Sequence, residues 1–139
     1  MKQHSRSGKK YFHLTNEECN QLFDLADATL LNAYPFSNKG FSCGLMTEDA
    51  KTYAGVSYQS DTKTLTMHAE ATALAHAAIH GDKRIVAITG PNCHICKQLI
   101  YESSLRSGID VVVILREQKM VKQIRISTMM PYPWPYSPS

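Results

Sequence analysis

The sequence lacks any long hydrophobic run, and this absence bounds where the chain is expected to act. No apolar segment among its 139 residues approaches the roughly 20 residues that a membrane-spanning helix requires. The basic start, residues 1–10, is not followed by the apolar stretch that a secretory signal needs. We therefore expect no membrane association and a cytoplasmic location.

The chain also has little net charge, and this argues against a protein built around a polynucleotide. The formal charge is only +3, and part of the surplus, including Arg6, Lys9 and Lys10, lies in the first ten residues. A long nucleic-acid groove would need more cations in the body of the domain. We interpret residues 1–12 as a flexible basic tail, although a short arm that contacts nucleic acid has a similar composition.

Cysteines are few, and only two of them are spaced like ligands. The four are Cys19, Cys43, Cys93 and Cys96. Disulfides are rare in cytosolic proteins of this size, and Cys19 and Cys43 lie in apolar surroundings typical of small core residues. Cys93 and Cys96 form a C-x-x-C pair, which leaves a redox pair or a metal site open.

The pattern of apolar residues predicts a single α/β domain over residues 13–139. No internal repeat or low-complexity segment interrupts it. Helical periodicity and capping residues predict helices over 16–32, 66–80 and 93–106. Apolar or alternating runs predict strands over 41–46, 52–58, 84–89, 109–115 and 121–126. Strand–helix–strand units with short loops indicate a three-layer αβα fold with a mixed five-stranded sheet. The Pro- and aromatic-rich end is expected to be extended and docked.

Two predicted helix starts carry the residues with chemistry. His68, Ala69 and Glu70 open one helix, and Cys93 and Cys96 open the next. Thiols three residues apart face the same way over a first turn, where the helix dipole favours thiolate. One imidazole and two thiolates suit tetrahedral Zn²⁺ and leave a fourth position for water. A carboxylate beside such a water can take its proton, which makes Glu70 a candidate catalytic residue.

Other interpretations of these residues stay open from the pattern alone. The C-x-x-C pair also fits a thioredoxin-like redox site, but that leaves His68 and Glu70 without a role. A structural zinc in a non-catalytic binding module is a second alternative. His76 and His80 have a two-ligand helical spacing, but no third ligand is near them in sequence. His94 is expected to point away from the thiols.

The motifs together resemble the zinc-dependent cytidine deaminase superfamily, in its free-nucleoside branch of cytidine and blasticidin S deaminases. The resemblance rests on His-Ala-Glu followed by C-x-x-C at the head of the next helix. It extends to Cys96-Lys97-Gln98, to segments 33–37 and 41–44, to the strand-like segment 55–59, and to the tail segment 130–134. It covers about residues 14–134.

The resemblance implies a role for each of these positions. It assigns zinc to His68, Cys93 and Cys96, and proton transfer to Glu70. It implies that substrate is contacted by Phe41, Ser57, Gln59, the backbone at Ala69, and Trp134. The implied reaction is hydrolytic deamination of a small-molecule cytosine nucleoside, such as cytidine, deoxycytidine or a blasticidin S-like analogue. It also implies a homotetramer or a homodimer.

Three positions depart from the family pattern. Pro usually stands directly before the first Cys, where this chain has Asn92. The ribose-binding strand usually carries Asn and Glu, where this chain has Ser57 and Gln59. The reaction type is therefore predicted more firmly than the substrate. Deamination of cytosine or adenine in RNA or DNA stays an alternative, as does a zinc-stabilised module without turnover.

Overall fold

The computed structural model describes residues 1–36 and 39–138. The strands are β1 (Lys2–Arg6), β2 (Lys9–His13), β3 (Ser42–Thr47), β4 (Thr52–Val56), β5 (Ile85–Thr89), β6 (Val112–Glu117) and β7 (Met120–Arg125). The helices are α1 (Asn16–Thr29), the short 3-10 helix η1 (Leu30–Asn32), α2 (Ala69–Ile79), α3 (His94–Ser107) and α4 (Ile126–Met129). Ser37, at the end of the segment 33–37 quoted above, lies outside the described residues.

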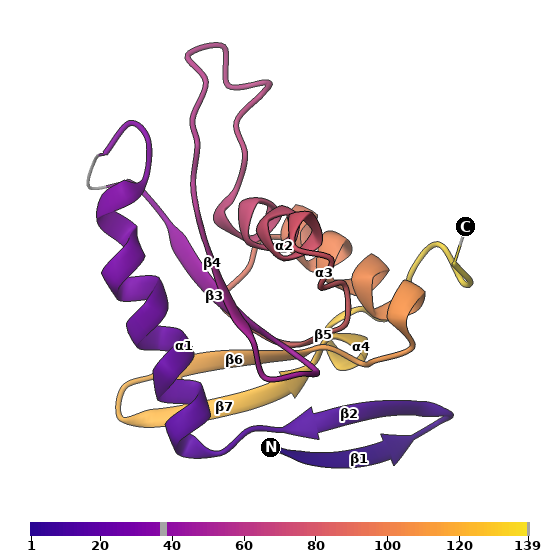
Figure 1. Ribbon diagram of the computed structural model, residues 1–139. Helices are drawn as coiled ribbons and strands as arrows, with labels where there is room; N and C mark the ends of the chain where they lie inside the picture. Colours follow the sequence, from indigo (N-terminus) through magenta and orange to yellow (C-terminus); the bar gives the residue numbers. More distant parts are fainter. Residues whose placement is uncertain (37–38, 139) are drawn as a thin grey trace.

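Five strands form one mixed sheet in the order β4-β3-β5-β6-β7. β5 and β6 are parallel and are joined by α3, while the other neighbouring pairs are antiparallel. α1 lies on one face of the sheet, and α2 and α3 lie on the other (Figure 1). The predicted three-layer αβα fold with a mixed five-stranded sheet is confirmed.

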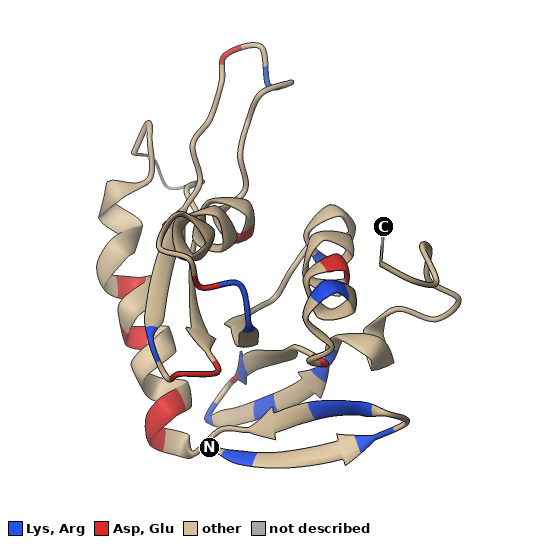
Figure 2. Cartoon of the chain, turned by 45° about the vertical axis from the view of Figure 1, so that its right-hand side comes forward, with Lys and Arg blue, Asp and Glu red and all other residues tan. Residues whose placement is uncertain are grey.

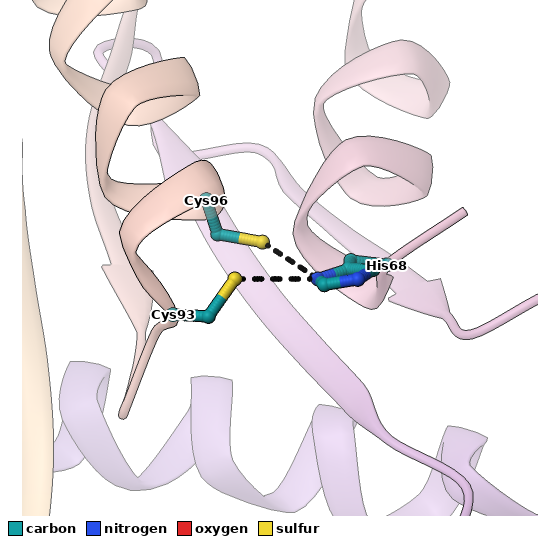
Figure 3. A group of neighbouring side chains, drawn as sticks. All are labelled: His68, Cys93 and Cys96. Atoms are coloured by element: carbon teal, nitrogen blue, oxygen red, sulfur yellow. Dashed lines mark hydrogen bonds between the residues drawn. The ribbon is translucent and has the colours of Figure 1, made fainter. Parts of the chain in front are cut away.

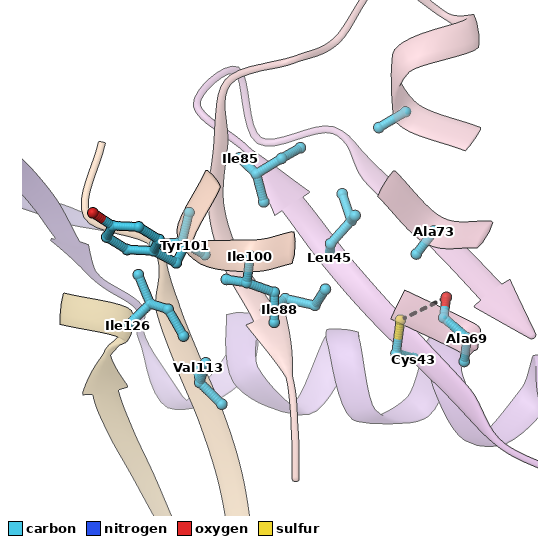
Figure 4. Packing of buried hydrophobic residues seen from close by; sticks show 12 residues of the cluster. Cys43, Leu45, Ala69, Ala73, Ile85, Ile88, Ile100, Tyr101, Val113 and Ile126 are labelled. Carbon is cyan, nitrogen blue, oxygen red and sulfur yellow. Dashed lines mark hydrogen bonds between the residues drawn. The ribbon is translucent and has the colours of Figure 1, made fainter. Parts of the chain in front are cut away.

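Each face of the sheet is covered by its own group of buried apolar side chains. Along β6, Val113 belongs to the group beneath α2 and α3, whereas Val112 and Ile114 belong to the group beneath α1. This alternation follows from the two-residue repeat of a strand. Figure 4 shows the first group, in which Ile88 lies next to Ile100 of α3 and Leu45 lies toward Ala73 of α2. The helices that carry the candidate site are therefore held by a continuous core.

The start of α1 agrees with the sequence prediction down to its cap. Thr15 accepts from the backbone N–H of Glu18, and the Glu18 side chain accepts from the backbone N–H of Thr15. This reciprocal capping box satisfies two N–H groups that the helix cannot pair internally. The predicted helix 16–32 is present as α1 followed by η1.

Residues 1–13 form an antiparallel hairpin of β1 and β2, which corrects the prediction of a flexible basic tail at residues 1–12. Ser7 and Gly8 lie in its turn with φ of 54° and 78°. Two-residue hairpin turns favour such left-handed conformations, and Gly adopts them without strain. Phe12 of β2 is buried in the group beneath α1. The basic residues suggested a flexible tail. The Ser7-Gly8 turn, followed by the apolar Tyr11 and Phe12, is the part of the sequence that indicates a hairpin.

The hairpin is tied to the rest of the chain by backbone and ionic contacts. The backbone N–H of Asp110 donates to the carbonyl oxygen of Lys10 at 2.8 Å. The Lys10 ammonium forms an ion pair with Glu48, which also pairs with Arg84. Figure 2 shows Lys and Arg along this hairpin and the acidic residues of α1 beside it. A single domain over residues 13–139 stays a prediction. Its expected boundary, between residues 12 and 13, falls within β2 of the hairpin.

The C-terminal segment is docked on α3, as expected, after a short helix that the sequence did not predict. α4 follows the predicted last strand directly, and Ile126 is fully buried. Beyond it, the Gln98 amide donates to the carbonyl oxygen of Trp134 at 2.7 Å. The Tyr101 hydroxyl donates to the carbonyl oxygen of Pro135 at 2.6 Å.

None of the helices in the described ranges combines the length and the apolar character that crossing a bilayer requires.

Candidate active site

The site is built from the first residues of α2 and α3. The sequence predicted a helix from residue 66, but α2 begins at Ala69, and His68 is its N-cap with extended backbone (φ −73°, ψ 156°). Met67 stays extended because it exchanges two backbone hydrogen bonds with Tyr58, of 3.0 and 2.8 Å. Cys93 is likewise the N-cap of α3. Both helices therefore present their N-terminal ends to the same region.

His68, Cys93 and Cys96 converge as the spacing predicted (Figure 3). The Nδ1 atom of His68 lies 3.4 Å from Cys93 Sγ and 3.2 Å from Cys96 Sγ. Tetrahedral Zn²⁺ with ordinary bond lengths separates its nitrogen and sulfur ligands by about 3.5–3.8 Å. The three donors therefore fit zinc with only small shifts. Within the described part of the chain, no other group of three or more His, Cys, Asp or Glu donors is this close.

The protonation of Cys96 differs from the sequence expectation. We expected the helix N-terminus to lower the thiol pKa, but burial, and after it the nearby Glu70 carboxylate, raise the pKa of Cys96. Burial disfavours the charged thiolate. A divalent cation between the sulfurs opposes both effects, because a coordinating thiol is deprotonated. The buried Cys96 thiol is therefore suited to a metal rather than to free thiolate chemistry.

Glu70 lies beside this donor set, in the first turn of α2, with a side chain that is 8% exposed. Its Oε2 atom accepts a hydrogen bond from the Nδ2 of Asn92 at 2.9 Å. Glu70 and His68 both line a single cavity of about 450 Å³, a volume in the range of small-molecule sites. The carboxylate is thus placed to transfer protons within this cavity.

The cavity also collects the predicted substrate residues of this region. Those that line it are Phe41, Ser57, Gln59 and Ala69. Phe41 is 67% exposed and forms part of the rim, whereas Ser57 is buried and its Oγ accepts from the Phe41 backbone N–H at 3.0 Å. The Ser57 hydroxyl can still donate to a ligand.

The two backbone groups of Ala69 differ in whether they already have a hydrogen-bond partner. Its carbonyl oxygen accepts from the Cys43 thiol at 3.3 Å and from the Thr72 hydroxyl at 3.0 Å. Its N–H belongs to the first turn of α2, where backbone donors have no partner within the helix. The N–H rather than the carbonyl is therefore suited to contact the edge of a base.

Trp134 is the predicted substrate residue that the structure does not bring to this cavity. Its side chain is 74% exposed, and it is not among the residues that line the cavity. Its backbone is held on α3 through Gln98.

Three features of the site escaped the sequence analysis. In the sequence, Asn92 stands out only because Pro is usual before the first Cys, yet in the structure its side chain donates a hydrogen bond to Glu70. Cys43 is buried as expected but also lines the cavity, and burial followed by the charge of Glu70 raises its pKa. Gly55 lets β4 lie against α2, because a Cβ there would come within 2.2 Å of the Ala69 carbonyl oxygen. Such contacts depend on packing that spacing alone cannot reveal.

The competing histidines do not join the site. His76 and His80 are exposed and contact each other through their rings. The Nδ1 of His76 donates to the carbonyl oxygen of Ala54, and the Nδ1 of His80 donates to the carbonyl oxygen of His76. His94 is exposed and does not line the cavity.

Comparisons with known proteins point to one family. The profile described as "Cytidine and deoxycytidylate deaminase zinc-binding region" matches residues 16–115. A curated relative, the cytidine deaminase of Sodalis glossinidius (strain morsitans), is 33% identical over 105 residues, which are 72% of this chain and 32% of that protein. The chain thus spans about a third of the length of the curated relative that it matches.

Solved structures share the fold. A cytidine deaminase from Burkholderia pseudomallei superposes with a TM-score of 0.72 at 25% identity, covering 87% of this chain and 100% of that one. A cytidine deaminase from Mycobacterium leprae gives 0.69 at 23% identity, covering 85% and 99%. The matched profile includes all three donor residues and Glu70.

Proposed function

Because this chain belongs to the cytidine and deoxycytidylate deaminase zinc-binding family, we propose that it is a zinc-dependent hydrolase that deaminates the cytosine of a free nucleoside. The products are the uracil form and ammonia. The observation that carries the proposal is the buried Glu70 beside the His68–Cys93–Cys96 donor set, with Glu70, His68 and Cys93 lining one cavity. A purely structural zinc site uses four protein ligands and needs no such carboxylate.

The bound zinc would be held by His68, Cys93 and Cys96, and would supply Lewis acidity that makes a water molecule nucleophilic at neutral pH. Glu70 accepts one proton from that water and delivers it to N3 of the base, and it then carries the second proton, from the hydroxyl on C4, to the departing amine. The water oxygen first bonds to C4, and the C4–N4 bond breaks afterwards, once the amine is protonated, so one water is consumed and one ammonia leaves. The first-turn N–H of Ala69 is placed to hold the base edge.

The lining of the cavity supports an uncharged nucleoside. Among the described residues that line it, none is Lys or Arg, so no side-chain cation there would balance a phosphate. Ser57 and Gln59 present neutral hydrogen-bonding groups on the same wall. Cytidine, deoxycytidine and a blasticidin S-like nucleoside are the proposed substrate types, within pyrimidine metabolism.

One observation favours a second candidate, a cytosine that carries phosphate in a nucleotide or a polynucleotide. A neighbouring hollow of about 620 Å³ is also lined by His68, and it contains Lys39 and Lys63. Lysine ammonium groups bind phosphate as point charges.

A substrate panel separates these candidates. Zinc-quantified protein is assayed by absorbance on cytidine, deoxycytidine, blasticidin S, cytidine 5′-monophosphate and a cytosine-containing oligonucleotide. We expect the highest kcat/KM on a nucleoside, with a loss of about tenfold or more when a phosphate is added. The opposite order would establish the second candidate. Bound zinc without turnover on any compound would indicate a non-catalytic module.

We also propose that the chain assembles as a homotetramer or a homodimer in the cytoplasm. Support comes from large apolar side chains that are more than half exposed, among them Leu31, Phe36, Leu65 and Ile95, because burying them between subunits would stabilise an assembly. Trp134 of one copy would then be free to reach the site of another. The four cysteines are unpaired, as expected in a reducing compartment. Light scattering that gives the 15.6 kDa mass of one chain would contradict the assembly.

A further inference from the structure

We propose that Asn92 is a positioning residue that fixes the Glu70 carboxylate for proton transfer, an inference that rests on the function proposed above. Asn92 lies between β5 and α3, directly before Cys93. Its Nδ2 donates to Glu70 Oε2 at 2.9 Å and to the carbonyl oxygen of Thr89 at 3.2 Å. One amide therefore links the end of β5 to the carboxylate on α2.

The orientation of this amide is set by its partners. An amide nitrogen carries two hydrogens, and here each one has an oxygen acceptor. Turning the amide over would place Oδ1 against both acceptors, which is repulsive. Gly90 leaves the necessary room, because a Cβ there would lie 2.9 Å from Asn92 Oδ1. The donor is thus held in one position relative to Glu70.

The other end of the amide shows that packing alone does not explain Asn92. Its Oδ1 is buried and has no hydrogen-bond partner among the described residues. An unpaired buried acceptor is destabilising, and an apolar side chain of the same shape would avoid it. A polar side chain that leaves its acceptor unpaired by protein while its donor meets the Glu70 carboxylate is typical of an active site, where function rather than packing selects the residue.

The contact has a defined consequence for the reaction. With Oε2 held by Asn92, Oε1 is the Glu70 oxygen left to accept the proton from water. The carboxylate plane is fixed before the reaction begins, so delivery to N3 and then to the amine needs no rotation of Glu70. Preorganisation of this kind lowers the barrier without changing how the ground-state substrate binds.

Asn92→Leu tests the inference, because Leu keeps the branched shape and removes both donors without adding charge. We expect kcat to fall by about 10- to 100-fold while KM, zinc content and thermal midpoint hold or the midpoint rises. Affinity for a nucleoside analogue that is tetrahedral at C4 should fall by the same factor as kcat, and affinity for the product nucleoside should not change. Asn20→Ala, at an exposed amide on α1, is the matched control.

Two results would overturn the role of Asn92. One is a kcat within about twofold of wild type, since loss of a transition-state contact must lower kcat. The other is a parallel loss of kcat, zinc and thermal midpoint, which would identify a structural residue.

A wild-type chain that is inactive on every nucleoside would refute the proposed function but not the contact between Asn92 and Glu70. A double-mutant cycle measured by urea unfolding tests that contact without turnover. Glu70→Ala should shift the urea midpoint by different amounts in the wild-type and the Asn92→Leu backgrounds, because contacting residues are not additive. Equal shifts would show that the two side chains are independent and would overturn the inference.

Discussion

Glu70→Gln is expected to abolish turnover while leaving the metal site loaded. Gln has the same size and can still meet Asn92, but it cannot accept a proton from water and return it to the base. Because Glu70 serves every proton transfer of the proposed reaction, we expect kcat to fall by about 10³-fold or more, toward the upper end for general acid–base catalysis. The measurement is kcat on the best nucleoside, with zinc quantified on the same sample.

The stability of the variant distinguishes catalysis from folding. Glu70 is an almost fully buried carboxylate, and replacing a buried charged group by a neutral amide removes a desolvation penalty. The thermal midpoint of Glu70→Gln should therefore equal or exceed that of wild type. Glu17→Gln, at an exposed position of α1, should retain wild-type kcat. An active Glu70→Gln enzyme would remove Glu70 from the mechanism.

The fold could be predicted from the sequence wherever one periodicity dominated. The apolar runs that became β5 and β6 lie beside each other as the only parallel pair of the five-stranded sheet, because a helix connects them. Thr15 and Gly108 end helices through local chemistry, Thr15 as a capping side chain at the start of α1 and Gly108 as a left-handed C-cap of α3 with φ of 76°. These signals act within a few residues, so no knowledge of the distant chain was needed.

The hairpin and the start of α2 needed tertiary information. Phe12 stabilises the hairpin by packing beneath α1, against residues that are far away in the sequence. His68 leaves the helix because Met67 pairs with Tyr58, although the sequence from residue 66 has good helix propensity. Tertiary contacts outweighed local preference in both places.

The site residues also fall into those that a local pattern reveals and those that only tertiary contacts reveal. His68, Glu70, Cys93 and Cys96 could be found because ligand types at two helix starts form a local pattern. Asn92 could not, because its importance lies in one hydrogen bond to Glu70 across 22 positions of sequence. Trp134 was carried over from the resemblance alone, and among the described residues its backbone is held on α3 and its side chain does not line the cavity.

Cys96→Ser is expected to remove both the metal and the activity. Serine replaces a soft thiolate by a hydroxyl that is a poor zinc ligand, and only His68 and Cys93 remain from the set. Two ligands do not hold zinc through gel filtration, so the metal content should drop from about one per chain to near zero. Turnover should fall to background, and added zinc should restore chelator-treated wild type but not the variant.

Cobalt substitution gives a readout that does not depend on turnover. Co²⁺ bound at the wild-type site should show the thiolate-to-metal charge-transfer band and the intense visible bands of a tetrahedral sulfur site, and Cys96→Ser should lose them. Cys19→Ala is the thiol control, because Cys19 is a buried residue of α1 and lies outside the donor group. It should keep zinc, the cobalt spectrum and kcat, at a modest cost in stability from the small cavity. Equal metal loss in both variants would trace the effect to general destabilisation, whereas loss in Cys96→Ser alone would assign the sulfur ligand.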